Sequence, residues 1–357
     1  MYSFTCQECA ASHEPSSLAW RCSCGGLLDL AWDGPEISEP PMAGDWSQWR
    51  YRVIPTLSET RVSLGEGMTP LVPSARLPGV TLKCDFFMPT GSFKDRGASV
   101  LATALSQIGV TRAVLDSSGN AATAMSAYCA KAGIDLTVFV PASTSPGKLA
   151  HITAHGAELK LVPGPRSEAA QAATAAANAE GVFYASHVYN PLFYHGVKTY
   201  IYEIFEQRGG SLPDTIMVPV GNGTMVLGAY LGITELKGAG LVQSVPRLVA
   251  IQAENCSPLA ARFAGVEPAE SNGTLAEGIA ITNPPRQAEI LSAIAELDGD
   301  VRTVTEAQIS TAKDNLAAEG FFVEPTAAVC YAAAMAAEDH GETVIPLCGS
   351  GLKSVSH

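Results

Sequence analysis

The chain has 357 residues, with a hydrophobic fraction of 47% and a charged fraction of 16%, so its composition is that of a folded protein. At about 150 residues per domain, this length predicts two domains and a small additional segment. The 22 Lys and Arg against 35 Asp and Glu give a net charge of −13, which argues against nucleic acid and anionic membranes as partners. No apolar run approaches the about 20 residues of a membrane-spanning helix, and the N-terminus MYSFTCQECA lacks a secretory-signal pattern.

The nine cysteines fall into two groups. Four of them, Cys6, Cys9, Cys22 and Cys24, lie within the first 24 residues, and the other five are scattered singly. Two close pairs of thiolates separated by 12 residues suit a tetrahedral zinc ion, although the second pair is one residue tighter than the usual spacing. We expect a structural, zinc-ribbon-like segment over 1–32; a cluster that has lost its metal and a redox pair are the alternatives. Single cysteines elsewhere indicate a reducing cytoplasm.

Strands and helices alternate along the rest of the chain. Residues 33–67 form a connector rich in Pro and Trp, including Pro40, Pro41, Trp46 and Trp49, that is expected to pack on the body. From about residue 68, apolar β-branched runs alternate with Ala-rich stretches, which predicts right-handed βαβ units and a parallel sheet. The expected strands are Ala113–Leu115, Leu136–Val140, Leu159–Val162, Thr215–Val220, Leu248–Ala253 and Thr343–Leu347. The expected helices are Ser118–Ala132, Pro146–His155 and Ser167–Glu180, each followed by glycine.

The octapeptide TGSFKDRG at 90–97 places Lys94 in a Gly/Ser turn, just before an Ala-rich helix that is expected to start near Ala98. It is not a P-loop, because that motif has Gly-Lys-Ser/Thr at its end. A lysine that is removed from water at such a turn can lose its proton and form an imine with a carbonyl cofactor. The alternative is a capped helix start with a charged first turn.

Three further glycine-containing motifs follow predicted strands. DSSGNA at 116–121 puts backbone N–H groups at a helix N-terminus, where they can bind a carboxylate or a phosphate. VGNGTM at 220–225 fits a phosphate nest, although Val226 stands where the dinucleotide fingerprint has its third glycine. PLCGSGLK at 346–353 ends the last strand, where open α/β sheets bind ligands. Ordinary N-caps, turns and a buried structural Cys348 are the alternatives.

Taken in order, these motifs resemble those of the fold type II pyridoxal phosphate enzymes, the tryptophan synthase β-like superfamily, and within it the threonine synthases and their paralogues. The octapeptide and the SSGN loop carry most of the resemblance, and GVKT at 196–199, EPT at 324–326 and the last motif add to it. The match covers roughly residues 60–355. The resemblance implies an α/β fold with two open, mostly parallel twisted sheets flanked by helices. A large cofactor-binding domain would comprise 68–95 and 200–357, and a smaller domain with the substrate-carboxylate loop would comprise 96–199.

The resemblance also implies roles for individual residues. Lys94 would form the imine with pyridoxal 5'-phosphate and act as the acid and base at the substrate Cα. The other cofactor-binding residues would be Phe93, Asn120 at the phenolic oxygen, Gly221, Asn222, Gly223 and Thr224 around the phosphate, and Cys348 at the pyridine nitrogen. The substrate carboxylate would lie on Ser117, Ser118, Gly119, Asn120 and Ala121. A neutral Cys348 would leave the ring nitrogen unprotonated, which disfavours transamination and leaves elimination accessible.

The function implied by the resemblance is that of a lyase or synthase acting on a small amino acid. The enzyme would form an aldimine with it, remove the Cα proton and eliminate a β or γ leaving group, with O-phosphohomoserine to threonine as the first assignment. Where the family has Asn-Ser-x-Asn-Pro-x-Arg, with the arginine on the substrate phosphate, this chain reads HVYNPLF at 187–193. His187 and Phe193 are therefore expected to line the substrate pocket, together with Ser350, which stands in CGSGLK where the family ending is Thr-Gly-His-Gly-Leu-Lys. Lys198, Arg96, His195 and Lys353 remain as phosphate donors.

Two alternatives to O-phosphohomoserine chemistry remain open. One is a paralogue that eliminates or replaces a group on a phosphoserine, serine or homoserine derivative. The other is a zinc-ribbon adaptor without catalysis, against which the intact Lys94 and both glycine loops argue. The expected partners are a small amino acid and a second copy of the chain in a homodimer, with neither nucleic acid nor membrane.

Overall fold

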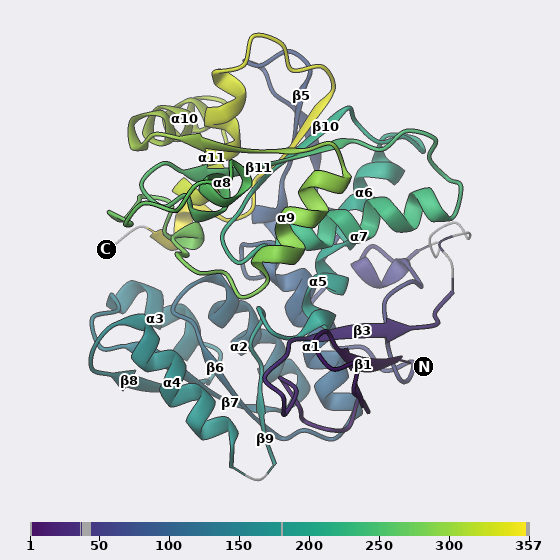
Figure 1. The fold of residues 1–357 in the computed structure, drawn as a ribbon, viewed down its shortest axis with the longest axis vertical. Helices are drawn as coiled ribbons and strands as arrows, with labels where there is room; N and C mark the ends of the chain where they lie inside the picture. Colours follow the sequence, from purple (N-terminus) through teal and green to yellow (C-terminus); the bar gives the residue numbers. More distant parts are fainter. Residues whose placement is uncertain (1, 36, 38–43, 180, 355–357) are drawn as a thin grey trace.

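The computed structural model describes residues 2–35, 37, 44–179 and 181–354 (Figure 1). In these residues the strands form three sheets, of which two are open and lie in separate lobes with helices around them. The expected α/β fold with two mostly parallel sheets is confirmed. Among the described residues, none of the helices combines the length and the apolar character that a bilayer crossing requires. Three residues named above, Pro40, Pro41 and Glu180, lie outside the described ranges.

The large sheet has six strands in the order β12-β11-β10-β13-β5-β4. Neighbouring strands are parallel except β4 and β5, which pair antiparallel at one edge. The strands are β4 (Leu71–Pro73), β5 (Val80–Lys83), β10 (Thr215–Pro219), β11 (Arg247–Ala253), β12 (Asp300–Val304) and β13 (Thr343–Pro346). The helices of this lobe are α6 (Thr199–Gln207), α7 (Thr224–Gly238), α8 (Pro258–Phe263), α9 (Gln287–Glu296), α10 (Glu306–Ala318) and α11 (Pro325–Met335). Residues 248–253 of β11 are all buried, as is typical of a strand covered on both faces.

The smaller sheet has four parallel strands in the order β8-β7-β6-β9. They are β6 (Arg112–Asp116), β7 (Asp135–Pro141), β8 (Glu158–Val162) and β9 (Val182–Tyr184). The helices between and around them are α1 (Lys94–Gln107), α2 (Asn120–Ala132), α3 (Pro146–Thr153), α4 (Arg166–Ala177) and α5 (Pro191–Val197). Because all four strands are parallel, the loops that follow them emerge at one edge of the sheet, where ligands bind in folds of this type.

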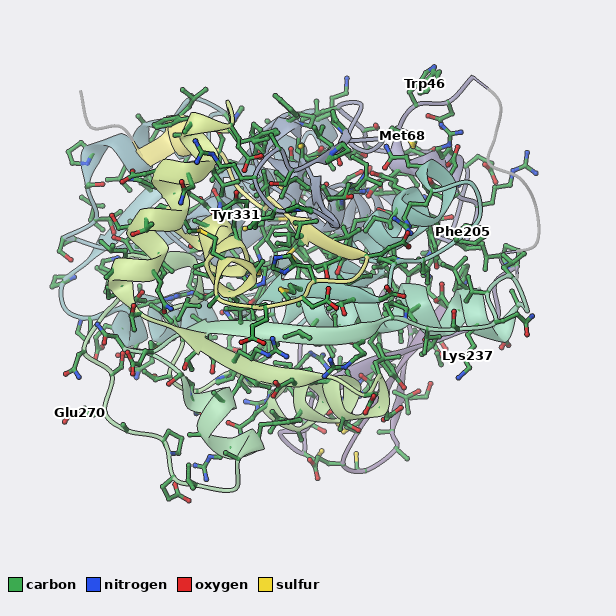
Figure 2. The ribbon with its side chains drawn as sticks, turned by 90° about the horizontal axis from the view of Figure 1, so that it is seen from above. Trp46, Met68, Phe205, Lys237, Glu270 and Tyr331 are labelled. Carbon is green, nitrogen blue, oxygen red and sulfur yellow. The ribbon has the colours of Figure 1, made fainter. Side chains whose placement is uncertain are left out.

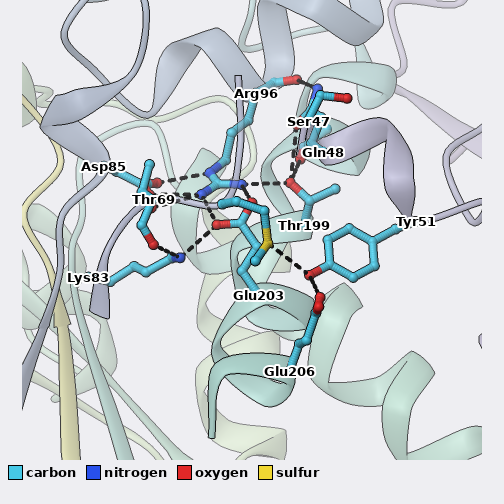
Figure 3. Close-up of polar contacts among 12 residues, drawn as sticks. Ser47, Gln48, Tyr51, Thr69, Lys83, Asp85, Arg96, Thr199, Glu203 and Glu206 are labelled. Atoms are coloured by element: carbon cyan, nitrogen blue, oxygen red, sulfur yellow. Dashed lines mark hydrogen bonds and ion pairs between the residues drawn. The ribbon is translucent and has the colours of Figure 1, made fainter. Parts of the chain in front are cut away.

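The prediction that the helix after the octapeptide starts near Ala98 is wrong: α1 starts at Lys94. The reason is a buried charge network beneath its first turn (Figure 3). The Arg96 guanidinium lies 2.8 Å from Asp85 and 2.5 Å from Glu203, and Lys83 lies 2.6 Å from Glu203. Gln48 donates to the backbone oxygen of Arg96 at 2.9 Å. These partners satisfy the buried charge and the backbone oxygen of Arg96, so the first turn of α1 forms in the interior although its charged residues are typical of an exposed turn.

The N-terminal sheet is antiparallel, in the order β2-β1-β3, with β1 (Tyr2–Cys6), β2 (Ser12–His13) and β3 (Leu28–Trp32). Its apolar face packs on α1 and α5. The buried residues of this contact are Tyr2, Phe4 and Leu28 on the sheet side and Val100, Ala104 and Leu192 on the helix side. The four-cysteine segment is therefore attached to the helix that begins with Lys94.

The connector after β3 packs on the body at its described end. The indole N–H of Trp49 donates to Glu66 at 2.9 Å and to the Ser99 hydroxyl of α1 at 3.0 Å. Trp46, by contrast, is 72% exposed and projects from the surface (Figure 2). Short 3-10 turns complete the described structure: η1 (Gln48–Arg50), η2 (Asp85–Phe87), η3 (Glu277–Ile279) and η4 (Gly351–Ser354).

Candidate active site

Lys94 is the first residue of α1, and its amine faces the large lobe. Its Nζ donates to the Thr224 hydroxyl at 3.0 Å and lies 4.5 Å from the ring centre of Phe93 and 5.5 Å from that of Phe193. Burial disfavours the ammonium form and lowers the pKa of Lys94 from 10.5 to about 7. An amine with this pKa is substantially neutral at neutral pH. It can therefore act as a nucleophile towards a carbonyl and as a base.

The glycine loop at 221–223 leads directly into α7, which starts at Thr224. Gly223 has a φ of +78°, which side-chain-bearing residues rarely adopt, and a Cβ there would lie 2.2 Å from Ile290. A Cβ on Gly221 would lie 2.8 Å from the Cα of Ile279. Because a glycine caps the helix, no side chain occupies the N–H groups of the first turn. Those donors, with the half-buried Asn222, suit an anion such as a phosphate.

The loop after β6 forms a second helix N-terminus, at α2. Gly119 caps this helix without a side-chain hydrogen bond, and its backbone N–H lies 3.4 Å from the Ser117 hydroxyl. Ser117 and Ala121 are buried, Ser118 and Asn120 are half-buried, and Gly119 is exposed. The exposed backbone of this loop is thus open to a small anion, as expected for a substrate carboxylate.

Asn120 lies at the centre of a polar cluster that joins the two lobes. Its amide nitrogen donates to both carboxyl oxygens of Glu324 at 3.0 Å, and its amide oxygen accepts from Lys353. The Lys353 amine also donates to the backbone oxygen of Thr90 at 3.1 Å. The Cys348 sulfur lies 3.9 Å from a carboxyl oxygen of Glu324. Asn120 and Cys348, which are expected at the phenolic oxygen and at the pyridine nitrogen of the cofactor, are therefore connected through the carboxyl group of Glu324.

Glu324 was not assigned a role from the sequence, although EPT contributed to the resemblance. Burial raises its pKa, against the opposing effect of Lys353, and burial also raises the pKa of Cys348 well above 9.0. The Cys348 thiol is therefore neutral at physiological pH. No pattern in the sequence links position 324 with position 120, since the contact depends on how the two lobes meet.

Backbone contacts bring the octapeptide and the last motif together. Phe93 donates its N–H to the oxygen of Cys348 at 3.0 Å, and Ser350 donates its N–H to the oxygen of Gly91 at 2.9 Å. The buried Ser350 hydroxyl lies 3.3 Å from the N–H of Leu352. Ser350 thus lies beside the lysine loop, with its hydroxyl used within its own turn.

The segment at 187–193 supplies one wall of the site. Phe193 lies on α5, and its ring packs closely on Gly97 of α1. A Cβ added to Gly97 would lie only 2.3 Å from the Phe193 ring. The ring of His187 lies 5.6 Å from that of Phe193. His187 is buried, its Nδ1 has no hydrogen-bond partner among the described residues, and burial together with Lys94 holds its pKa well below 6.5. A neutral imidazole with an unused nitrogen and the lysine amine therefore both lie near the ring of Phe193.

Arg166 was not assigned a role from the sequence, although its charge acts on groups of the site. It is the first residue of α4, at the same sheet edge as the 117–121 loop, and it is exposed. Its positive charge contributes to lowering the pKa of Lys94 and of His187, and it opposes the burial that raises the pKa of Asp116. The positive charge of Arg166 thus acts on all three groups.

Two of the expected phosphate donors are occupied by other partners. Arg96 belongs to the buried network of Figure 3, and Lys198 is paired with Glu235 at 2.8 Å. His195 is a buried neighbour of Lys198. Of the four candidates, only Lys353 has its amine in contact with a residue expected to bind the cofactor or the substrate, namely Asn120.

The four N-terminal cysteines converge. Their sulfur atoms all lie within 4.8 Å of one another, with Cys6 and Cys24 at 3.5 Å and Cys9 and Cys22 at 3.6 Å. Zn–S bonds of about 2.3 Å in a tetrahedron require sulfur atoms about 3.8 Å apart, so the cluster fits zinc. The backbone N–H of Gly26 points to the Cys24 sulfur at 3.4 Å, as expected for a thiolate ligand.

The residues present fit pyridoxal phosphate. Lys94 can provide the amine for the carbonyl group, and the 221–223 loop offers backbone donors, with no room for a Cβ at either Gly221 or Gly223. Asn120 and Cys348 provide polar groups for the ring. His187, with its unused nitrogen, supplies a further donor or acceptor on the side of the wall.

Comparison with known proteins agrees with this fit. The family model described as pyridoxal-phosphate dependent enzyme matches residues 62–349. A threonine synthase of Methanosarcina acetivorans is 33% identical over 97% of this chain and 90% of its own length, and one of Methanocaldococcus jannaschii is 32% identical over 90% and 84%. Among solved structures, a threonine deaminase of T.th. superposes with a TM-score of 0.68 at 26% identity, over 79% of this chain and 92% of its own. The chain therefore belongs to the family of pyridoxal-phosphate dependent enzymes, with the fold type II architecture.

Proposed function

We propose that this protein is a pyridoxal-phosphate dependent lyase of the threonine synthase type, which converts O-phosphohomoserine and water to threonine and phosphate. The observation that carries the proposal is the Lys94 amine, with its pKa near 7, held against Thr224 of the glycine loop. The likeness to curated threonine synthases over nearly the whole chain supports the same reaction. Nine free cysteines support a reducing cytoplasm, and the homodimer stays a prediction.

The chain's own residues would perform most of the chemistry. The cofactor, when bound, supplies a carbonyl for the substrate amine and a ring that accepts the electrons of bonds broken at Cα. Backbone N–H groups of 118–121 would hold the substrate carboxylate, and Lys94 would remove the Cα proton and return protons to the carbon chain. Lys94 would also remove a Cβ proton, whose bond electrons form a Cβ–Cγ double bond as phosphate leaves Cγ with the electrons of its C–O bond, and that proton would be returned to Cγ. Water would then add a hydroxyl at Cβ and supply the balancing proton.

The leaving phosphate requires a cation, and Arg166 is the candidate. The family arginine is replaced by Phe193, whose ring cannot bind an anion. Arg166 begins α4 at the sheet edge of the 117–121 loop, and its charge contributes to lowering the pKa of Lys94 and of His187. Planar guanidinium groups bind phosphates through two parallel hydrogen bonds. Arg166 would thus do from α4 what the family arginine does from the position of Phe193.

A second candidate function is favoured by Phe193 itself. An apolar ring 5.5 Å from the lysine amine suits a shorter, uncharged side chain, such as that of a serine or homoserine derivative. The enzyme would then catalyse β- or γ-elimination or replacement without phosphate release.

The deciding experiment is an assay of the cofactor-loaded protein. We expect stoichiometric threonine and inorganic phosphate from O-phosphohomoserine. Pyruvate or 2-oxobutanoate from serine, phosphoserine or homoserine derivatives, with no threonine from O-phosphohomoserine, would favour the second function. No turnover together with no visible absorbance after incubation with pyridoxal phosphate would favour the non-catalytic alternative.

A further inference from the structure

The four-cysteine segment contacts the substrate side of the site through an aromatic cluster. The ring of Trp20 lies 5.0 Å from those of Tyr184 and Tyr189, edge to face in both cases. The guanidinium of Arg21 lies 5.7 Å from the ring of Tyr189. Trp20 and Arg21 directly precede Cys22, so the loop that carries the second cysteine pair rests on the chain that leads to His187.

Arg286 makes a second, polar connection between the same two segments. It is 1% exposed, and one of its terminal nitrogens donates to the backbone oxygens of Leu28 at 2.7 Å and of Tyr189 at 3.0 Å. Its Nε donates to the oxygen of Val188 at 3.2 Å. The remaining nitrogen is paired with Glu289 at 2.8 Å. A buried cation is costly unless its donors are used, so this geometry strongly favours one arrangement of the two segments.

Both connections end next to groups of the active site. Residues 188 and 189, whose carbonyls bind Arg286, follow His187 directly. The Tyr184 hydroxyl, below Trp20, donates to the carboxylate of Asp116, the residue before the 117–121 loop. The N-terminal segment is thus connected through Tyr184 to the strand end before the 117–121 loop, and through Arg286 to the backbone that follows His187.

We propose that Arg286 and Trp20 are positioning residues through which the metal-loaded four-cysteine segment fixes the 184–190 backbone at the substrate side of the site. The proposal rests on the proposed function only in assigning His187 to the substrate pocket. Without the metal, the loop bearing Cys22 and Cys24 loses its cross-link, and the contacts of Trp20 with Tyr184 and Tyr189 lose their support. Substrate affinity then falls while the lysine and the glycine loop stay in place.

The test is hydrogen exchange of the cofactor-loaded, full-length protein, measured on peptides covering 184–190. We expect Arg286→Met to raise exchange there at least tenfold, and chelation of the metal to do the same in the original protein. Chelation should raise exchange further in Arg286→Met, where the Trp20 contacts remain, and should add little in Trp20→Leu, where the contact through which the metal-bound loop acts is already removed. Arg262→Met is the matched control, since Arg262 is paired with Glu267 on the exposed surface. If Arg286→Met does not fold, Trp20→Leu, which alters a half-buried ring, should give the same local exchange.

Steady-state kinetics provide the second measurement. Arg286→Met should raise KM for the amino-acid substrate about tenfold with a smaller change in kcat, and the cofactor absorbance should be unchanged. Unchanged exchange at 184–190 in both variants and after chelation would overturn the proposal. The exchange measurement needs no turnover, so it distinguishes a failure of this proposal from an error in the assigned reaction.

Discussion

The lowered pKa of Lys94 gives a testable pH dependence. Only the neutral amine attacks the carbonyl group of the cofactor, and burial shifts the pKa from 10.5 to about 7. The rate of cofactor incorporation into cofactor-free protein should therefore rise with pH and level off above about pH 7 rather than above 10.5. The growth of visible absorbance after mixing measures this rate. A continued rise up to pH 10 would show that the amine is exposed to water.

Arg166 should decide between phosphorylated and uncharged substrates. Hydrogen bonds to charged groups contribute about 1.5–3 kcal/mol, so Arg166→Met should raise KM for O-phosphohomoserine by about 10- to 150-fold. Turnover of an unphosphorylated amino acid should be little affected. Arg302→Met is a suitable control, because Arg302 is a half-exposed side chain paired with Asp300 on β12. Equal losses with both types of substrate would mean that Arg166 acts on folding instead.

The site residues that could be predicted from the sequence are those within short motifs. Lys94, Gly223 and Asn120 lie at or directly before helix N-termini, where local patterns are informative. Glu324 and Arg166 could not be assigned in this way. Glu324 reaches Asn120 across 204 positions of the chain, and Arg166 lies on a helix whose first residue gives no signal of what faces it. Such contacts depend on how the lobes are packed.

Among the elements, the start of α7 offers a sharp comparison between two glycines of one helix. Gly223→Ala forces a Cβ into Ile290 at a φ of +78°, which should cost about 1–3 kcal/mol and weaken cofactor binding. Gly238→Ala, at the other end of α7, meets nothing within 4 Å and should be neutral or slightly stabilising. Thermal unfolding and cofactor titration of both variants check this. Equal effects would mean that the 221–223 loop is not constrained.

The boundaries of elements were predictable where apolar periodicity and glycine stops agree. The expected helix ending at Ala132 ends there, followed by Gly133 in the left-handed conformation. The start of α1 was misplaced because Asp95 and Arg96 resemble an exposed turn, whereas both are fully buried. The three-stranded pairing of the N-terminal segment was not predictable from cysteine spacing alone, since that spacing does not specify which strands pair.

At the scale of the whole molecule, the buried network of Figure 3 joins the lysine helix to the large lobe. Burial alone would raise the pKa of Glu203, but Arg96 and Lys83 lower it from 4.5 to about 2. A carboxyl group with a lowered pKa stabilises the fold fully above pH 4.5, and this contribution is lost as the pH falls towards 2. Glu203→Gln should lower the free energy of unfolding by about 3–5 kcal/mol at neutral pH. The variant should also lose less stability than the original protein as the pH falls below 4.5.

Measurement of the free energy of unfolding between about pH 3 and 7 checks this prediction, with Glu267→Gln as the control because that carboxylate is 83% exposed. An equal loss in both variants would contradict it.

The division into a large domain of 68–95 with 200–357 and a smaller domain of 96–199 stays a prediction. The two sheets lie on either side of the boundaries that it names, since β6 to β9 all fall between 112 and 184.

The contact between Gly97 and the ring of Phe193 constrains how this site can evolve. An alanine at 97 has no room while a phenylalanine stands at 193, since its Cβ would lie 2.3 Å from the ring. The two positions are therefore expected to show epistasis: Gly97→Ala should be damaging alone and better tolerated together with Phe193→Val. A lineage that acquires a new substrate by replacing Phe193 with a smaller residue can then tolerate an alanine at position 97. Once that alanine is fixed, a reversion to phenylalanine at position 193 would clash with it.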